Sequence, residues 1–279
     1  MCWWGVWCLW ACVWCVCGWL WLWMARVETH AICLRHWPFS ETSQTVLLLG
    51  ETTGLVRAIA KGSRRDDPRF SGGVELTDVA VADVIVPESG ALATLAGWDL
   101  ARVFPGVRRH ATAFDAAMFS LDFVAGFLGE LDPHPESYRA LVTLLGELDQ
   151  GVGGSMFPAL VRFEWAVLGD VGYRPTLEGE ADAAGLYRFG PDRGGLGAEP
   201  GERAWDVRAG TVDRLRALGG GWSGAGDGGG DGAGPDALAG ERVDERGAAL
   251  LAAYARELLG RPLAGEERVF SGGLPHPGA

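Results

Sequence analysis

Five short apolar runs, each bounded by turn-forming residues, occupy residues 28–104 of this chain. They read ETHAICLRHW (28–37), TVLLLG (45–50), GLVRAIAKG (54–62), GGVELTDVAVADVIVP (72–87) and ALATLAGWDLARVF (91–104). Their apolar residues do not recur at helical spacing, and short apolar runs between turn signals are typical of strands. Five strands in about 80 residues predict a small β-barrel or sandwich, with a five-stranded Greek-key barrel the common solution. The pattern alone does not separate an OB-fold from an SH3-like barrel.

Two residues within these runs have specific predicted roles. The ETTG stretch at 51–54 predicts a hairpin turn in which Gly54 takes a positive φ angle. Cys33 lies in an apolar stretch of strand character, which predicts a small buried hydrophobe. It is the only cysteine after residue 23, and this argues against a disulfide framework and for a reducing compartment.

After Pro105 the pattern becomes helical. Apolar residues recur at helical spacing over 108–148, with DPHPES at 132–137 as a break and N-cap region. Further helices are predicted over 157–168, 205–220 and 245–260, the last ended by Gly260. Residues 178–204 are predicted to form a loop, and the Gly-rich segment 219–240 is predicted to be disordered because it is too poor in apolar residues.

The predicted fold class is therefore α+β. A small β-barrel over 24–105 precedes an all-α helical domain over 106–270, which carries the disordered insert, and a tail covers 271–279.

The first 23 residues, MCWWGVWCLWACVWCVCGWLWLW, have a different character. The length fits a membrane-spanning helix. However, eight tryptophans run through the segment, whereas tryptophan prefers the membrane interfaces, and a signal peptide would need a basic start and a cleavage site. The few residue types used are largely those that G- and T-rich codons specify. We interpret the segment as translated non-coding DNA with Met24 as the start; a membrane anchor and a signal peptide are the alternatives.

The net charge limits the class of binding partner, and the absence of catalytic motifs argues against an enzyme. The net charge is −12, which at face value disfavours a protein that coats polyanions, although local charge matters more than the sum. The five histidines are scattered without metal-ligand spacing, and the chain has no Walker A motif, no GxSxG elbow and no GxGxxG after a strand. The sequence therefore predicts no catalytic residues, no metal and no cofactor.

The segment RAIAKGSRRDDPRF at 57–70 opposes the acidic character of the chain. It contains five basic residues and two aspartates, which gives the segment a net charge of +3. On a small barrel such a loop can follow a phosphate backbone, with nearby aromatic side chains available to stack bases. The alternative is a solvated loop whose arginines pair with Asp66 and Asp67. The candidate DNA-binding residues are Arg57, Lys61, Arg64, Arg65 and Arg69.

These motifs in combination resemble the RecO family of bacterial recombination mediators. The stretch ETHAICLRHWPFSETSQTVLLLGETTGLVRAIAKGSRR is similar to the family's opening: a first strand, a Tyr/Phe-Ser-Glu-Thr-Ser element, a hairpin with Gly and an Ala-Lys-Gly-x-Arg-Arg loop. Residues 162–179 resemble the helix that ends in Gly-Tyr-x-Pro, and residues 205–218 and 250–261 resemble the closing helices. The resemblance covers almost everything from Met24 to about Phe270 and agrees with a start at Met24.

The resemblance implies an N-terminal OB-fold and a C-terminal helical domain without enzymatic activity. It implies binding of single- and double-stranded DNA, annealing of complementary strands, contact with the tail of single-stranded DNA-binding protein, and loading of RecA together with RecR. Carried over, Lys61, Arg64 and Arg65 fall in the DNA-facing loop, and Arg35 is a further candidate. The expected location is cytoplasmic and associated with the nucleoid.

Two features depart from the family pattern. Many members carry a four-cysteine zinc site after the Gly-Tyr-x-Pro motif, yet residues 174–196 contain no cysteine. A tetrahedral zinc site needs four nitrogen or sulfur ligands, so we predict no zinc. Asp66 and Asp67 stand where relatives tend to be basic or neutral, which predicts weaker and more salt-sensitive DNA binding.

Two arginines are candidates for a protein partner. Acidic tails are usually met by arginine beside an apolar pocket, and Arg139 or Arg162 fits this role for the tail of single-stranded DNA-binding protein; an ordinary structural role is the alternative for both. Two rival functions also stay open. One is a protein adaptor whose barrel does not bind DNA, and the other is a membrane-anchored protein if residues 1–23 are a real anchor.

Overall fold

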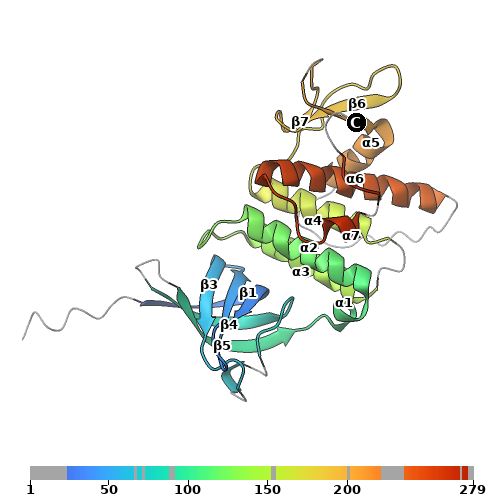
Figure 1. Cartoon of the computed structure of the whole chain (residues 1–279). Helices are drawn as coiled ribbons and strands as arrows, with labels where there is room; N and C mark the ends of the chain where they lie inside the picture. The colour runs from blue at the N-terminus through green and yellow to red at the C-terminus, as the bar shows by residue number, and fades with distance from the viewer. Residues whose placement is uncertain are drawn as a thin grey trace, which may run out of the picture.

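A computed structural model gives the fold and describes residues 24–65, 68–70, 73–87, 92–151, 155–199, 202–220, 236–270 and 272–275. The predicted leader at 1–23 lies outside the described residues, as do Asp66 and Asp67. Among the helices that the structure describes, none is long and apolar enough to cross a membrane. Figure 1 shows a barrel beside a group of helices, with a small sheet at the end farthest from the barrel.

The barrel has the five predicted strands, and the order of these strands around the barrel fits an OB-fold. The strands close in the order β1-β2-β3-β5-β4, and only β3 and β5 run parallel to each other. Closure pairs every strand on both sides and so leaves no open edge. Gly54 has a φ of 71°, as the ETTG turn predicts. The strands are β1 (Met24–Pro38), β2 (Gln44–Gly50), β3 (Gly54–Ala60), β4 (Val79–Pro87) and β5 (Ala93–Arg102).

Both faces of strand β2 are buried. Val46 and Leu48 lie in the barrel interior, whereas Leu47 and Leu49 join the core shared with the helices. A strand covered on both faces is apolar at successive positions, which explains the unbroken run TVLLLG. Cys33 is buried in the barrel interior, as predicted, and burial raises the pKa of its thiol.

The structure confirms a break between two helices, because α2 ends at Phe127 and α3 begins at Pro135, within the predicted break and N-cap region at 132–137. Figure 1 shows α2 and α3 next to the barrel, with α4 and α6 beyond them. Helix α6 is buried on all sides over residues 247–255, where its alanines allow close packing against α4. The elements are η1 (Pro68–Phe70), α1 (Pro105–Arg109), α2 (Ala111–Phe127), α3 (Pro135–Asp149), α4 (Phe157–Asp170), α5 (Ala209–Gly220), α6 (Asp236–Leu259) and α7 (Glu266–Val269).

A three-stranded sheet corrects two predictions for the second half of the chain. It has the order β7-β6-β8, with β6 at Leu186–Gly190, β7 at Gly195–Leu196 and β8 at Trp205–Arg208. The predicted loop over 178–204 and the predicted helix start at 205 are therefore wrong, and the helical domain is not all-α. These strands are too short, and their surroundings too rich in Gly and Asp, to give a clear period-2 pattern.

Aromatic rings attach this sheet to the central helix. The rings of Phe189 and Trp205 stack with centroids 5.5 Å apart, and Tyr254 of α6 packs edge-on against Phe189 at 5.4 Å. Such pairs add to the apolar burial of large side chains.

The Gly-rich segment is shorter than predicted. Helix α5 continues to Gly220 and α6 begins at Asp236, so residues 219–220 and 236–240 are helical rather than disordered. The rest of the predicted segment lies outside the described residues.

The tip of the β2–β3 hairpin joins the barrel to the helical domain. The Leu131 N–H donates to the Leu55 carbonyl oxygen over 2.9 Å. At the same point the Cα of Gly54 lies so close to Asp132 that an added Cβ would overlap its main chain. One apolar core includes Leu49 and Leu55 of the barrel together with Leu128 of the helical domain, so the two domains share a packed interface.

Candidate nucleic-acid interface

The turn after β3 presents three of the predicted DNA-binding side chains. Lys61, Arg64 and Arg65 are all exposed. The Arg65 N–H donates to the carbonyl oxygen of Gly62 over 2.9 Å, and Gly62 has a φ of 80°. Glycine adopts this left-handed conformation without strain, which allows the chain to turn sharply here. The Ala-Lys-Gly-x-Arg-Arg motif therefore places three cations on one tight turn.

A second turn, residues 39–43 between β1 and β2, braces this one; we call residues 39–43 and 61–65 the paired turns. The Gly62 N–H donates to Oγ of Ser43 over 3.3 Å. The buried Ser63 hydroxyl donates to Oε1 of Gln44 over 3.0 Å. The Ser-Glu-Thr-Ser element thus supplies a hydroxyl that fixes the cationic turn, so two motifs that are separate in the sequence meet at one end of the barrel.

The three cations on this turn lack a carboxylate partner among the described residues. Lys61, Arg64 and Arg65 make no ion pair with any residue placed by the structure, whereas Arg108 and Arg214 elsewhere each lie 2.6 Å from an aspartate. Three positive charges on one compact turn, unpaired among the described residues, raise the local potential even in an acidic protein. This is the type of surface that attracts a polyanion.

Arg57 and Arg69 flank the paired turns and have other contacts. Nε of Arg57 lies 2.9 Å from Oε1 of Glu130, and both side chains are exposed. An exposed ion pair contributes roughly 0–1 kcal/mol, so a phosphate group can replace Glu130 at little cost. Arg69 in η1 lies over the ring of Phe70, with 5.7 Å between the guanidinium carbon and the ring centroid. Both arginines stay predicted DNA contacts.

Arg35 lies away from the paired turns, at the junction of the two domains. Its guanidinium donates a hydrogen bond to Asp122 of α2. Burial alone would raise the pKa of Asp122, but hydrogen bonds from Arg261 and Ala264 and the charges of both arginines outweigh it and lower that pKa. The structure therefore gives Arg35 a structural contact, and its role in DNA binding stays a prediction.

Two exposed aromatic residues lie at the start of the paired turns, Trp37 just before the first turn and Phe39 as its first residue, and the sequence did not single them out as candidates. Trp37 and Phe39 are 44% and 62% exposed, although most large aromatic side chains of the described residues are buried. The Trp-Pro-Phe triplet in front of the Ser-Glu-Thr-Ser element is the sequence signal that could have identified them.

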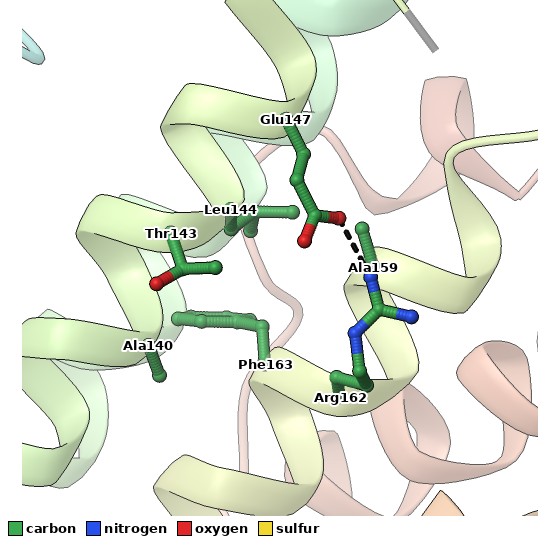
Figure 2. Close-up of a pocket in the computed structure, with 7 residues that line it drawn as sticks. All are labelled: Ala140, Thr143, Leu144, Glu147, Ala159, Arg162 and Phe163. Carbon is green, nitrogen blue, oxygen red and sulfur yellow. Dashed lines mark hydrogen bonds and ion pairs between the residues drawn. The ribbon is translucent and has the colours of Figure 1, made fainter. Parts of the chain in front are cut away.

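Of the two candidate partner-binding arginines, Arg162 lines a pocket. Figure 2 shows this small open pocket between α3 and α4, with Arg162 and Glu147 at its rim and the Phe163 ring inside. Nη2 of Arg162 lies 2.7 Å from Oε2 of Glu147. Arg139 instead pairs with Glu136 on the surface of α3, over 2.6 Å. Arg162 therefore combines a cation with a small, mainly apolar depression between α3 and α4.

In the described part of the chain, no group of three or more His, Cys, Asp or Glu side chains is placed to coordinate a metal ion. His134 lies between two carboxylates, 3.3 Å from Asp170 and 3.4 Å from Asp132. Asp170 also accepts hydrogen bonds from the N–H and the hydroxyl of Ser137, so it caps the start of α3. This cluster has a structural purpose, and the absence of zinc stays a prediction.

Comparison with protein-family models matches both parts of the chain to two domains of one family. The family model described as Recombination protein O N terminal matches residues 24–104, and the model described as Recombination protein O C terminal matches residues 110–226. The first match covers the barrel with its paired turns, and the second covers helices α2 to α5 with the pocket.

Individual proteins of the same family are also similar to this chain. DNA repair protein RecO of Anaeromyxobacter sp. (strain K) is 30% identical over 205 residues, which cover 70% of this chain and 80% of the relative. DNA repair protein RecO of Rubrobacter xylanophilus is 30% identical over 209 residues, which cover 70% of this chain and 81% of the relative. DNA repair protein RecO of Geobacter metallireducens is 32% identical over 156 residues, and the chain spans only 62% of the length of that relative.

Proposed function

The chain belongs to the RecO family, and from that premise we propose that it is a non-catalytic mediator of DNA repair and homologous recombination. In this role it binds single- and double-stranded DNA, anneals complementary strands and works with RecR to load RecA onto DNA coated with single-stranded DNA-binding protein. It acts in the cytoplasm, at the nucleoid.

The observation that carries this proposal is the cationic turn. Lys61, Arg64 and Arg65 are exposed and have no ion-pair partner among the described residues, while other arginines of this acidic protein face carboxylates. Neutralising phosphates releases condensed counterions, which supplies sequence-independent affinity. A mediator that handles any damaged sequence needs this type of binding.

The pocket at Arg162 supports the contact with single-stranded DNA-binding protein. An acidic tail can place a carboxylate on Arg162, beside the mainly apolar residues that line the depression between α3 and α4. Binding then requires that the tail replace Glu147 as the partner of Arg162. The contact with RecR is proposed from family membership alone.

Fluorescence anisotropy with labelled single-stranded DNA across a salt series tests the proposal. With about three to five phosphate contacts and a slope of about 0.7 per contact, log affinity falls by roughly two to three and a half units per tenfold rise in salt. Changing Lys61, Arg64 and Arg65 to alanine together should reduce both the affinity and the slope.

A matched control removes the same charge elsewhere. Arg208, Arg242 and Arg246 are exposed on β8 and α6, and changing all three to alanine also lowers the net charge by three. This control should bind DNA nearly as the parent does. Equal losses in both triple variants would show that only the total charge matters. Salt-independent binding, or none at low salt, would favour the adaptor that does not contact DNA.

The membrane-anchored alternative has its own test. A real anchor at 1–23 predicts that the full-length protein sediments with membranes. Recovery of a soluble protein whose first peptide begins at Met24 or Ala25 would exclude it.

A further inference from the structure

The exposed aromatic residues Trp37 and Phe39 are adjacent to the cationic turn. Single exposed apolar residues are common on protein surfaces. Here two large aromatic side chains lie two positions apart, one just before the first of the paired turns and the other at its first residue. Their place beside the cationic turn gives this surface both positive charge and exposed aromatic ring faces.

Strand pairing places Trp37 on the outer face of the barrel that leads to Lys61. Trp37 lies opposite Thr45 on β2, and Thr45 lies opposite Ile59 on β3. Alternate residues of a strand share a face, so Lys61 continues the line of Ile59 past the end of β3. Strands are spaced by about 4.8 Å, which places β1 about 10 Å from β3. A short nucleic-acid strand that crosses the paired turns can therefore contact the tryptophan and the cation together.

Backbone hydrogen bonds fix the main chain at Phe39 relative to the cationic turn. The Phe39 N–H donates to the Ser43 carbonyl oxygen over 3.0 Å, which closes the first turn. The Arg64 N–H donates to the Thr42 carbonyl oxygen over 3.2 Å, which joins the second turn to the first. A pre-organised surface loses less conformational freedom when it binds.

We propose that Trp37 and Phe39 are a stacking platform for the unpaired bases of single-stranded DNA, so that the paired turns distinguish single strands from duplex. This inference rests on the function proposed above and deepens it. Phosphates are available to Lys61, Arg64 and Arg65 in both forms of DNA. Base faces are available only in a single strand, because in a duplex they are stacked inside the helix, and aromatic side chains bind such faces without sequence preference.

Three probes of equal length separate the two contributions: an oligo-dT strand, an abasic strand with the same phosphates, and a duplex. The parent protein should bind oligo-dT about tenfold more tightly than the abasic strand, since one stacked base contributes about that factor. The double variant Trp37→Ala and Phe39→Ala should bind oligo-dT as weakly as the abasic strand. Its affinity for duplex and its salt slope should not change.

Two further variants make the test specific. Trp37→Phe together with Phe39→Tyr keeps the ring faces and should retain the preference for oligo-dT. Phe114→Ala removes an exposed aromatic side chain from α2, away from the paired turns, and should have no effect.

The outcomes distinguish failure of the platform from failure of the proposed function. If the parent binds oligo-dT and the abasic strand equally well, with a steep salt slope, the platform is refuted and the proposed function stands. If the parent binds none of the three probes at low salt, both are refuted. The comparison of oligo-dT with the abasic strand uses only the parent, so it decides the matter even if the double variant does not fold.

Discussion

Arg35 of β1 donates a hydrogen bond from Nη2 to Oδ1 of Asp122 in α2, a contact between residues 87 positions apart. The Asp122 side chain is 5% exposed. It also accepts hydrogen bonds from Nη1 of Arg261 over 2.7 Å and from the Ala264 N–H over 2.9 Å. One carboxylate thus joins the barrel, the first long helix and the segment after α6.

Replacing Asp122 with alanine should destabilise the whole protein. The change removes the shared acceptor and leaves two guanidinium groups facing each other in a partly buried site. The two guanidinium groups are 43% and 42% exposed, so solvent screens their charges, and losing the hydrogen bonds to the carboxylate should cost about 1.5–3 kcal/mol of the free energy of unfolding. Urea denaturation followed by circular dichroism would measure this loss.

Glu136→Ala is a suitable control for Asp122→Ala. It breaks the exposed pair with Arg139, and its cost should be about 1 kcal/mol or less. If the two variants lose equal stability, Asp122 does not join the domains as inferred.

Glu164 on α4 should lower the stability of the parent protein at neutral pH. Its side chain is 0% exposed, and neither carboxylate oxygen has a hydrogen-bond partner among the described residues. Burial therefore raises the pKa of this carboxyl well above its ordinary value. Glu164→Gln keeps the shape without the charge, and Glu164→Met replaces it with an apolar side chain. We expect the methionine variant to gain roughly 1–3 kcal/mol at pH 7, because an unsatisfied buried group is removed.

The pH dependence of stability gives a second test of Glu164. A carboxyl whose pKa is higher in the folded than in the unfolded protein binds its proton more tightly when folded. Its stabilising contribution is complete below the unfolded value of about 4.3 and is lost as the pH rises through the raised folded value. Thermal melts from pH 5 upward should therefore show a steeper decline for the parent than for Glu164→Gln. Parallel curves would show that Glu164 is not buried as described.

Gly54→Ala should disrupt the contact between the β2–β3 hairpin and the helical domain. Gly54 has a left-handed φ, and an added Cβ would overlap the Asp132 main chain. Gly260 has a similar φ of 65°, but an added Cβ there meets no atom within 4 Å. Gly260→Ala should cost about 1–2 kcal/mol from the backbone conformation alone. Gly54→Ala should cost about 1–3 kcal/mol more from overpacking, measured by the same urea titration. Equal costs would exclude the steric contact.

Binding of an acidic tail at the α3–α4 pocket should depend on Arg162. A synthetic peptide with the C-terminal sequence of single-stranded DNA-binding protein would lose about tenfold or more in affinity to Arg162→Ala, since a hydrogen bond to a charged group contributes about 1.5–3 kcal/mol. Glu147→Gln removes the competing carboxylate and should strengthen binding. Calorimetric titration of the peptide measures both, with Arg139→Ala as the control. If peptide affinity falls with Arg139→Ala but not with Arg162→Ala, the binding site lies on the outer surface of α3 instead.

Predictions from the sequence succeeded where local pattern and tertiary environment agree. The barrel strands were predicted because each apolar run ends at turn residues, and Gly54 was predicted because a tight hairpin turn favours glycine. The cationic turn was predicted because Lys61, Arg64 and Arg65 are close in the sequence. Strands β6 to β8 were missed because Phe189 and Trp205 are held by stacking on each other and by Tyr254, which lies far along the chain.

The sequence by itself determined the strands of the barrel, most of the helices and the position of the basic cluster, since these depend on hydrophobic periodicity, turn residues and charge within short segments. Only the tertiary structure decided that Ser43 braces Gly62, that Trp37 and Phe39 lie beside the cations, and that Arg35 faces Asp122 instead. Each of these depends on how distant segments pack. The energy of such contacts comes from burial and hydrogen bonding between segments, and neither is encoded in any one stretch of residues.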